Sequence, residues 1–170
     1  GADHPDTLTS RNNLAGAYRA AGRLDEAITL YEQVLPDRIR VLGEDHPDTL
    51  TSRDNLAGTY RKAGRTGEAI ALYEQVATGR ARVLGPNYPD TLTSRHNLAN
   101  IYRSVSRLDE VITLYENLLP NHIRVLGADH PDTLSSRNSL AYAYVSDGRL
   151  TEAIALFEQV LPDSTRILGE

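Results

Sequence analysis

The chain has 170 residues and no cysteine, which excludes disulfides and thiolate metal sites. Its formal net charge of −5 comes from intermixed charges of both signs, which argues against a nucleic-acid-binding protein, because such proteins usually carry a basic surplus. No apolar run reaches the roughly 18 residues of a membrane span, and no basic segment with an apolar run opens the chain. We therefore expect a cytoplasmic protein with no membrane partner.

The sequence repeats itself with a period of 42 residues. Glycines mark the interval at Gly1, Gly43, Gly85, Gly127 and Gly169, and each of the first four precedes a variant of Asp-His-Pro-Asp-Thr-Leu. Such self-similarity along a whole chain is typical of solenoids, in which each unit packs on its neighbours. We predict a single domain over 1–170. Its four repeats are 1–42, 43–84, 85–126 and 127–168, and residues 169–170 begin a fifth.

Each repeat is predicted to begin with an amphipathic helix. In the first repeat, Leu8, Ala15 and Tyr18 recur at the spacing of one helix face. Asp3 or His4 can cap its start, and the following proline suits a first turn, where its missing N–H has no intrahelical partner.

The first helix is predicted to end at a glycine, because glycine adopts the left-handed conformation at little cost. Gly22, Gly64 and Gly148 occupy this position in three repeats, whereas the third repeat has Ser106. We expect the third turn to be the least favourable of the four.

A second helix is predicted from about Leu24 to the next repeat's glycine. Pro36, Pro120 and Pro162 interrupt its apolar pattern. A proline inside a helix removes a hydrogen bond to the carbonyl four residues back. The apolar pattern resumes after each proline, so a kink rather than a break is predicted. The second repeat has Ala77-Thr78-Gly79 there and should differ in curvature.

Several motifs of Asn13–Glu32 resemble the tetratricopeptide repeat: Asn-Leu-Ala, then Tyr, Gly, Glu-Ala-Ile and Leu-Tyr-Glu. The usual repeat has 34 residues. The 42-residue length and the Leu-Gly-x-Asp-His-Pro-Asp-Thr-Leu linker are similar to the longer repeats of kinesin light chains, and similar arrays occur in the sensor regions of bacterial signalling NTPases. The resemblance implies an all-α, right-handed superhelix of four helix-turn-helix repeats. Its first helices would line a concave groove that binds a peptide, and in kinesin light chains asparagines and basic residues of the groove hold acidic peptides.

Helical spacing independently places one polar side of each first helix opposite its packing face. The predicted groove residues are Asn12, Asn13, Arg19, Asp54, Asn55, Arg61, His96, Asn97, Asn100, Arg103, Asn138 and Tyr142.

Two ladders of side chains follow from this placement. Asn13, Asn55 and Asn97 form a polar ladder whose amides can pair with a peptide backbone; alternatively, they cap neighbouring backbone or bind water. Arg19, Arg61 and Arg103 form a basic ladder suited to carboxylates; alternatively, they pair with nearby Asp and Glu residues or form a solvated surface. Tyr142 is the best aromatic anchor.

No catalytic or metal constellation is visible. His4, His46 and His130 lie one repeat apart, on the order of 10 Å, which is too far to share a metal ion. They are predicted to pack at helix starts. No nucleophile motif or phosphate-binding loop is present, so we expect no enzyme activity and no cofactor.

A further set of arginines occupies one slot on the packing face. Their stems are predicted to pack while their heads find a carboxylate or a helix end, so no functional role is expected of them. The set comprises Arg11, Arg53, Arg95 and Arg137.

The predicted function is a non-catalytic scaffold that binds a protein segment in its groove, with an acidic peptide as one option. One alternative is a structural solenoid that associates end to end, because the last second helix carries Leu150, Ile154, Phe157 and Leu161 on one side. Another is the sensor arm of a larger bacterial signalling NTPase.

Overall fold

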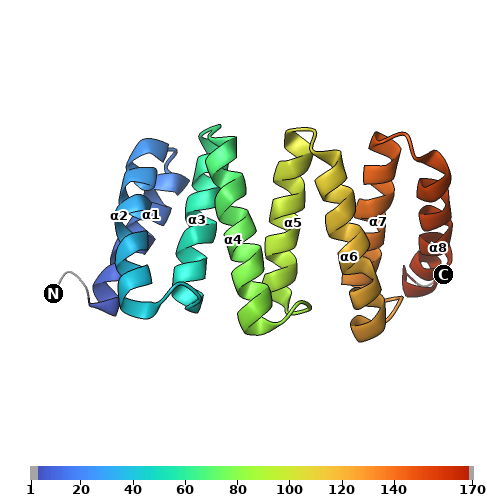
Figure 1. Cartoon of the computed structure of the whole chain (residues 1–170), viewed down its shortest axis with the longest axis horizontal. Coiled ribbons are helices and arrows are strands. Elements are labelled where there is room, and N and C mark those ends of the chain that lie inside the picture. Colours follow the sequence, from blue (N-terminus) through green and yellow to red (C-terminus); the bar gives the residue numbers. More distant parts are fainter. Residues whose placement is uncertain (1–3, 169–170) are drawn as a thin grey trace. The chain divides into compact units, whose positions relative to one another are not determined.

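The computed structural model describes the backbone of residues 4–168 and the side chains of residues 4–160. These residues form eight helices and no strand (Figure 1). The helices are α1 (Pro5–Ala20), α2 (Leu24–Leu42), α3 (Pro47–Lys62), α4 (Thr66–Leu84), α5 (Pro89–Ser104), α6 (Leu108–Leu126), α7 (Pro131–Ser146) and α8 (Leu150–Leu168). Helices of 16 and 19 residues alternate, which confirms the predicted all-α architecture of helix-turn-helix units.

Histidines cap the starts of three first helices. The Nδ1 atoms of His4, His46 and His130 accept a hydrogen bond from the backbone N–H two residues later, at 3.2–3.3 Å. A proline follows each of them as the first helical residue. The predicted helix-start role is thus confirmed, and the described residues contain no group of three or more side chains that could hold a metal ion.

Left-handed residues end the first helices. Gly22, Gly64 and Gly148 have φ of 77°, 76° and 79°, and Ser106 adopts the same turn at φ 59°. In each turn the next N–H donates to a carbonyl five residues back, as in Arg107 N–H to the Tyr102 carbonyl at 2.9 Å. Within the described residues Ser106 is the one non-glycine residue with positive φ.

The second helices do not break at their prolines. α2 continues through Pro36 and α6 through Pro120, and the backbone of α8 continues through residue 162, whose side chain lies outside the described residues. α4 has Gly79 in place of a bulkier residue. A Cβ atom there would lie 2.7 Å from Leu50 Cδ2, so this glycine permits a close approach of α3 and α4.

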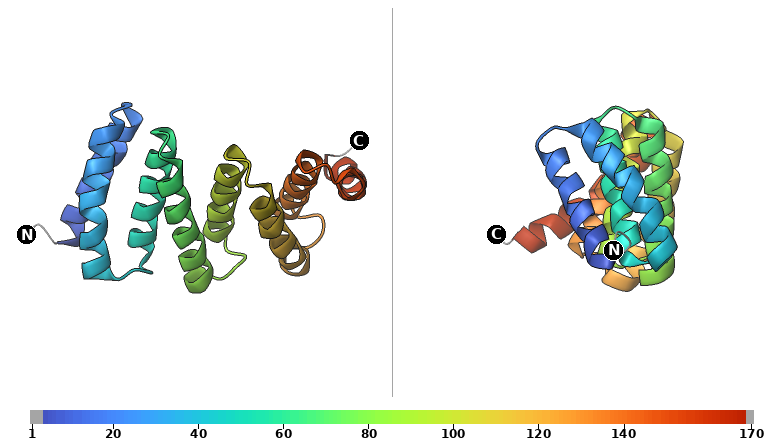
Figure 2. Two further views of the ribbon diagram at one scale, coloured as in Figure 1. Left: turned by 45° about the horizontal axis from the view of Figure 1, so that its top comes forward. Right: turned by 90° about the vertical axis from the view of Figure 1, so that its left-hand side faces the viewer.

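The chain divides into two compact units, residues 1–101 and 102–170. In the first unit, α1 packs on α2, α2 on α3 and α3 on α4 (Figures 1 and 2). Its core includes Leu8, Ala15, Ala27, Tyr31, Val34, Leu50, Leu56, Ala57, Ala69, Tyr73 and Val76. In the second unit, α7 packs on both α6 and α8. None of the helices in the described part is long and apolar enough to cross a membrane.

Candidate functional site

The candidate site lies on the polar side of α1 and α3 in the first unit. We define the first-helix face by Asn13 and Arg19 of α1 and Asn55 and Arg61 of α3. Asn13 and Arg61 are exposed, whereas Arg19 and Asn55 are half-buried. All four can contact solvent.

Two guanidinium groups of this face lie beside one tyrosine hydroxyl. Arg61 forms a hydrogen bond with Tyr73 of α4, and Arg19 acts on the same hydroxyl through its charge. A Cβ atom at Gly58 would lie 3.3 Å from Arg19 Nη1 and 3.4 Å from the Tyr73 hydroxyl, so Gly58 leaves room for both groups. Burial raises the pKa of Tyr73, and the two arginines oppose that shift. The hydroxyl is therefore neutral near pH 7 and does not cancel either positive charge.

Among the described residues, no carboxylate lies within ion-pair distance of Arg19 or Arg61. Asp54 acts on Tyr73 through its charge, but its own carboxylate is paired with Arg80, 3.2 Å from Oδ2 to Nη1. The sequence left two alternatives open for this ladder, pairing with nearby acids and a solvated surface. Pairing with nearby acids is not found for Arg19 and Arg61 in the part of the chain that the structure describes, and a solvated surface stays open.

The other predicted residues of the first unit differ in exposure. Asn100 is exposed, and His96 and Asn97 are half-buried. Asn12 is 7% exposed, because its Oδ1 accepts a hydrogen bond from the Ser52 hydroxyl of the next repeat at 2.9 Å. Asn12 and Asp54 are therefore taken up by contacts inside the protein, contrary to the expectation that they face a ligand.

Buried cations form a polar layer between repeats that the sequence reasoning missed. Arg38, 3% exposed, donates to the Asp48 carbonyl at 2.6 Å and to the Ser52 and Thr9 hydroxyls at 3.0 and 3.2 Å. Burial lowers its pKa. Such a layer holds successive first helices to the second helix between them.

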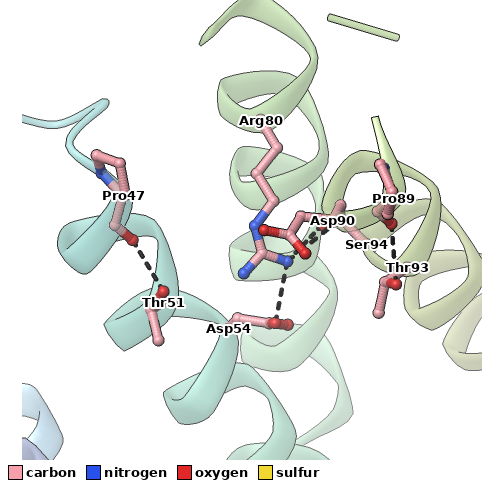
Figure 3. A network of polar contacts seen from close by, with 8 residues as sticks. All are labelled: Pro47, Thr51, Asp54, Arg80, Pro89, Asp90, Thr93 and Ser94. Carbon is pink, nitrogen blue, oxygen red and sulfur yellow. Dashed lines mark hydrogen bonds and ion pairs between the residues drawn. The ribbon is translucent and has the colours of Figure 1, made fainter. Parts of the chain in front are cut away.

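The layer recurs 42 residues later. Arg80 donates to the Ser94 hydroxyl at 2.7 Å and to the Asp90 carbonyl at 3.4 Å, and it pairs with Asp54 (Figure 3). In the second unit, His122 occupies the same repeat position, with Nδ1 3.0 Å from the Ser136 hydroxyl. The sequence does carry a signal for this layer, because a basic residue (Arg38, Arg80 or His122) recurs every 42 residues within the otherwise apolar stripe of the second helices.

The second unit carries a different surface on α7. Tyr142 is 61% exposed, and its ring meets Phe157 of α8 edge to face at 5.3 Å between centroids. Asn138 is half-buried and Arg103 is exposed. Ser139, which breaks the asparagine ladder, hydrogen-bonds the Tyr115 hydroxyl. Tyr142 is thus available to a ligand, whereas the Ser139 side chain is engaged in a contact between α7 and α6.

A separate set of arginines covers the tyrosines at the ends of the first helices. Each guanidinium carbon lies 4.1–4.5 Å from a ring centroid, in the pairs Arg23–Tyr18, Arg65–Tyr60, Arg107–Tyr102 and Arg149–Tyr144. Arg23 and Arg65 also pair with Glu26 and Glu68. Burial and a 2.6 Å hydrogen bond to Glu32 raise the pKa of Tyr60 to about 12. Arg23 and Arg65 therefore differ from Arg19 and Arg61 in having carboxylate partners.

Comparison with known proteins identifies the repeat type. The family model of the tetratricopeptide repeat matches residues 6–82, 55–121 and 90–164. A solved structure from Podosopora anserina, a putative kinesin light chain with nearly identical TPR-like repeats, is 35% identical with a TM-score of 0.92. The match covers 100% of this chain and 81% of the Podosopora anserina chain. The structure of BtubC (BKLC) from P. vanneervenii shares the fold at 20% identity, with a TM-score of 0.79 over 96% of this chain and 65% of its own.

A curated relative matches over a shorter stretch. Protein KINESIN LIGHT CHAIN-RELATED 2 of Arabidopsis thaliana is 55% identical over 40 residues. That stretch is 24% of this chain and 6% of the relative, so the match concerns a small part of a much longer protein.

Proposed function

Because the chain belongs to the tetratricopeptide repeat family, with repeats of the kinesin light chain type, we propose that it is a non-catalytic interaction module. Repeats of this family generally act as scaffolds for protein–protein interaction. The finer proposal is that the first-helix face binds an acidic segment of a partner protein. Asn13 and Asn55 would pair with its backbone, and Arg19 and Arg61 with its carboxylates.

One observation carries this proposal: the two guanidinium groups beside Tyr73 have no carboxylate partner in the described part of the protein. Arginine donates in a planar fork that matches a carboxylate, and charge-assisted hydrogen bonds are stronger than neutral ones. The adjacent amides both donate and accept, so they can pair with a peptide backbone whatever its side chains. Together these groups suit an extended acidic peptide.

The test uses a blocked nonapeptide of alternating serine and glutamate, titrated calorimetrically into the protein at low salt. The double variant Arg19→Gln, Arg61→Gln should weaken binding about tenfold, because it removes two charge-assisted contacts of about 0.7 kcal/mol each. Added salt should weaken wild-type binding and have less effect on the variant.

A matched control is Arg23→Gln, Arg65→Gln, which removes the same charge from arginines that are already paired with glutamates. This variant should keep most of the affinity. Equal losses in both double variants would mean that net charge alone attracts the peptide. Unchanged binding of the Arg19, Arg61 variant, with intact helical circular dichroism, would remove the first-helix face from consideration.

A second candidate is end-to-end self-association, favoured by the exposure of matching apolar side chains on α1 and α8. Leu14 of α1 is 48% exposed, whereas its repeat counterparts Leu56, Leu98 and Leu140 are at most 6% exposed. On α8, Ile154 is 56% exposed, whereas its counterparts Ile28 and Ile112 are 5% exposed and Ile70 is half-buried. We therefore propose that the exposed surface of α1 in one molecule packs on the exposed surface of α8 in another, as a first helix packs on the preceding second helix at a repeat boundary.

A further inference from the structure

The repeat position occupied by Arg11 and Arg53 has different surroundings in the first two repeats. In the first repeat, Arg11 Nη1 lies 3.3 Å from Asp37 Oδ2, and Arg11 Nη2 lies 3.3 Å from the Gln33 amide oxygen. This agrees with the prediction that arginine heads in this slot find a carboxylate or a helix end. In the second repeat, residue 75 is again glutamine, but the counterpart of Asp37 is Gly79. The second repeat therefore keeps the guanidinium and the amide and lacks the carboxylate.

Arg53 is the guanidinium of that second slot. It is 8% exposed, and its Nη1 donates to the Glu44 carbonyl at 3.2 Å. No carboxylate lies within ion-pair distance of it among the described residues. A mostly buried charge without a counter-ion is unfavourable, and an anion that reached it would be held in a site of reduced dielectric constant.

Arg53 lines an open polar hollow of about 480 Å³ on α4. Gln75 and Thr78 add an amide and a hydroxyl that can donate hydrogen bonds, and Arg82 stands at the rim, paired with Asp45. Glu44 and Glu74 also border the hollow. Their charges disfavour a phosphate dianion, so the monoanionic carboxylate is the group that this set of donors fits best.

A second hollow adjoins the first along α4, and Ala71 borders both. It has a volume of about 580 Å³ between α2 and α4. Its apolar lining comes from Leu35, Pro36, Ile39, Leu56 and Leu72, and Glu32, Arg40, Tyr60 and Glu68 also border it. Pro36 lacks an N–H, so the carbonyl of Glu32 at the edge of this hollow has lost its usual helical donor. A ligand reaching both hollows would meet a cation at one end and aliphatic side chains at the other.

We propose that this outer surface is a second binding site, which takes an acidic side chain of a protein segment on Arg53 and a neighbouring branched aliphatic side chain in the apolar hollow. The carboxylate would stand where repeat one has its own Asp37. The site uses none of the residues of the first-helix face. It can therefore be tested separately from the proposed function.

The experiment follows the Arg53 side-chain N–H by nuclear magnetic resonance during titration with N-acetyl-Leu-Glu-amide. Saturable shifts at Arg53 and at the backbone amides of Ala71 and Thr78 are expected. N-acetyl-Leu-Gln-amide, which lacks the charge, should bind at least fivefold more weakly, and so should acetate, which lacks the aliphatic group. Equal affinity for the glutamine analogue would overturn the carboxylate site, and equal affinity for acetate would overturn the role of the apolar hollow.

Variants assign the site to Arg53. Arg53→Gln should abolish the shifts, whereas Arg11→Gln, the same change in the slot already filled by Asp37, should leave them intact. Gly79→Asp supplies an internal carboxylate and should block binding, whereas Gly79→Ala should not. A Cβ atom there would lie 2.7 Å from Leu50 Cδ2 and 3.4 Å from Asp45 Oδ1, so both variants require Leu50 to shift, and unchanged helical circular dichroism of both is the control. Binding that survives both Arg53→Gln and Gly79→Asp would overturn the proposal.

Discussion

At the scale of single residues, buried cations join neighbouring repeats. Arg38 gives three hydrogen bonds to acceptors on α1 and α3, and Arg80 repeats the arrangement with the next pair of helices. Because a buried polar group left without its partner costs more than an average hydrogen bond contributes, these side chains fix how successive first helices are placed.

Replacement of Arg38 tests this role. Arg38→Ala should lower the free energy of unfolding by about 3 kcal/mol, because it removes three hydrogen bonds and leaves a cavity. Arg38→His should cost less, since His122 occupies the same repeat position against Ser136. The measurement is urea denaturation followed by circular dichroism.

The control for that prediction is Arg40→Ala, which removes an exposed arginine paired with Asp37 on the same helix. Its cost should stay below about 0.5 kcal/mol. Similar costs for Arg38→Ala and Arg40→Ala would show that the polar layer contributes little to stability.

Residue placement was predictable from the sequence only where helical spacing leaves no choice. Leu8 and Ala15 were assigned to the packing face correctly. Asn12 and Asn13 are adjacent, so a rotation of 100° separates them, and the pattern could not decide which of them the next repeat covers. The structure buries Asn12 under Ser52. The contacts of Arg38 were not predictable, because they need the packing of three helices.

At the scale of elements, the repeat period defined the helices well. The proline after each capping histidine and the left-handed residue at each turn place the helix ends where the sequence predicted them. The second helices were predicted to continue past their prolines, because the apolar pattern resumes after each of them. α2 and α6 are indeed continuous through Pro36 and Pro120.

The turn at Ser106 yields a prediction at this scale. Its φ of 59° is costly for a residue with a Cβ atom, whereas three other repeats have glycine there. Ser106→Gly should stabilise the protein by about 0.5 kcal/mol, less than the full left-handed penalty because glycine gains freedom in the unfolded chain. The midpoint of urea denaturation should rise. The reverse change, Gly64→Ser, should lower it by a similar amount, and a lower midpoint for Ser106→Gly would contradict the argument.

At the scale of the whole molecule, the identical spacing of the repeats gives α1 and α8 surfaces of complementary kind. The counterparts of Leu14 inside the array are buried, and those of Ile154 are buried or half-buried, whereas Leu14 and Ile154 themselves are exposed. Burial of apolar surface is favourable by roughly 25 cal/mol per Å² before the cost of association. Light scattering with in-line chromatography should therefore show a mass that rises with protein concentration. A mass of one chain at the highest concentration would contradict end-to-end association.

Two variants distinguish this association from non-specific aggregation. Leu14→Asp blocks the α1 surface and Ile154→Asp blocks the α8 surface, so each variant alone should remain at one chain. Each keeps the surface that the other lacks, so an equimolar mixture should form dimers and nothing larger. Val83→Asp, a change at another exposed apolar residue, should associate like the wild type. A mixture that stays monomeric would show that α1 and α8 do not bind each other, even if the wild type aggregates.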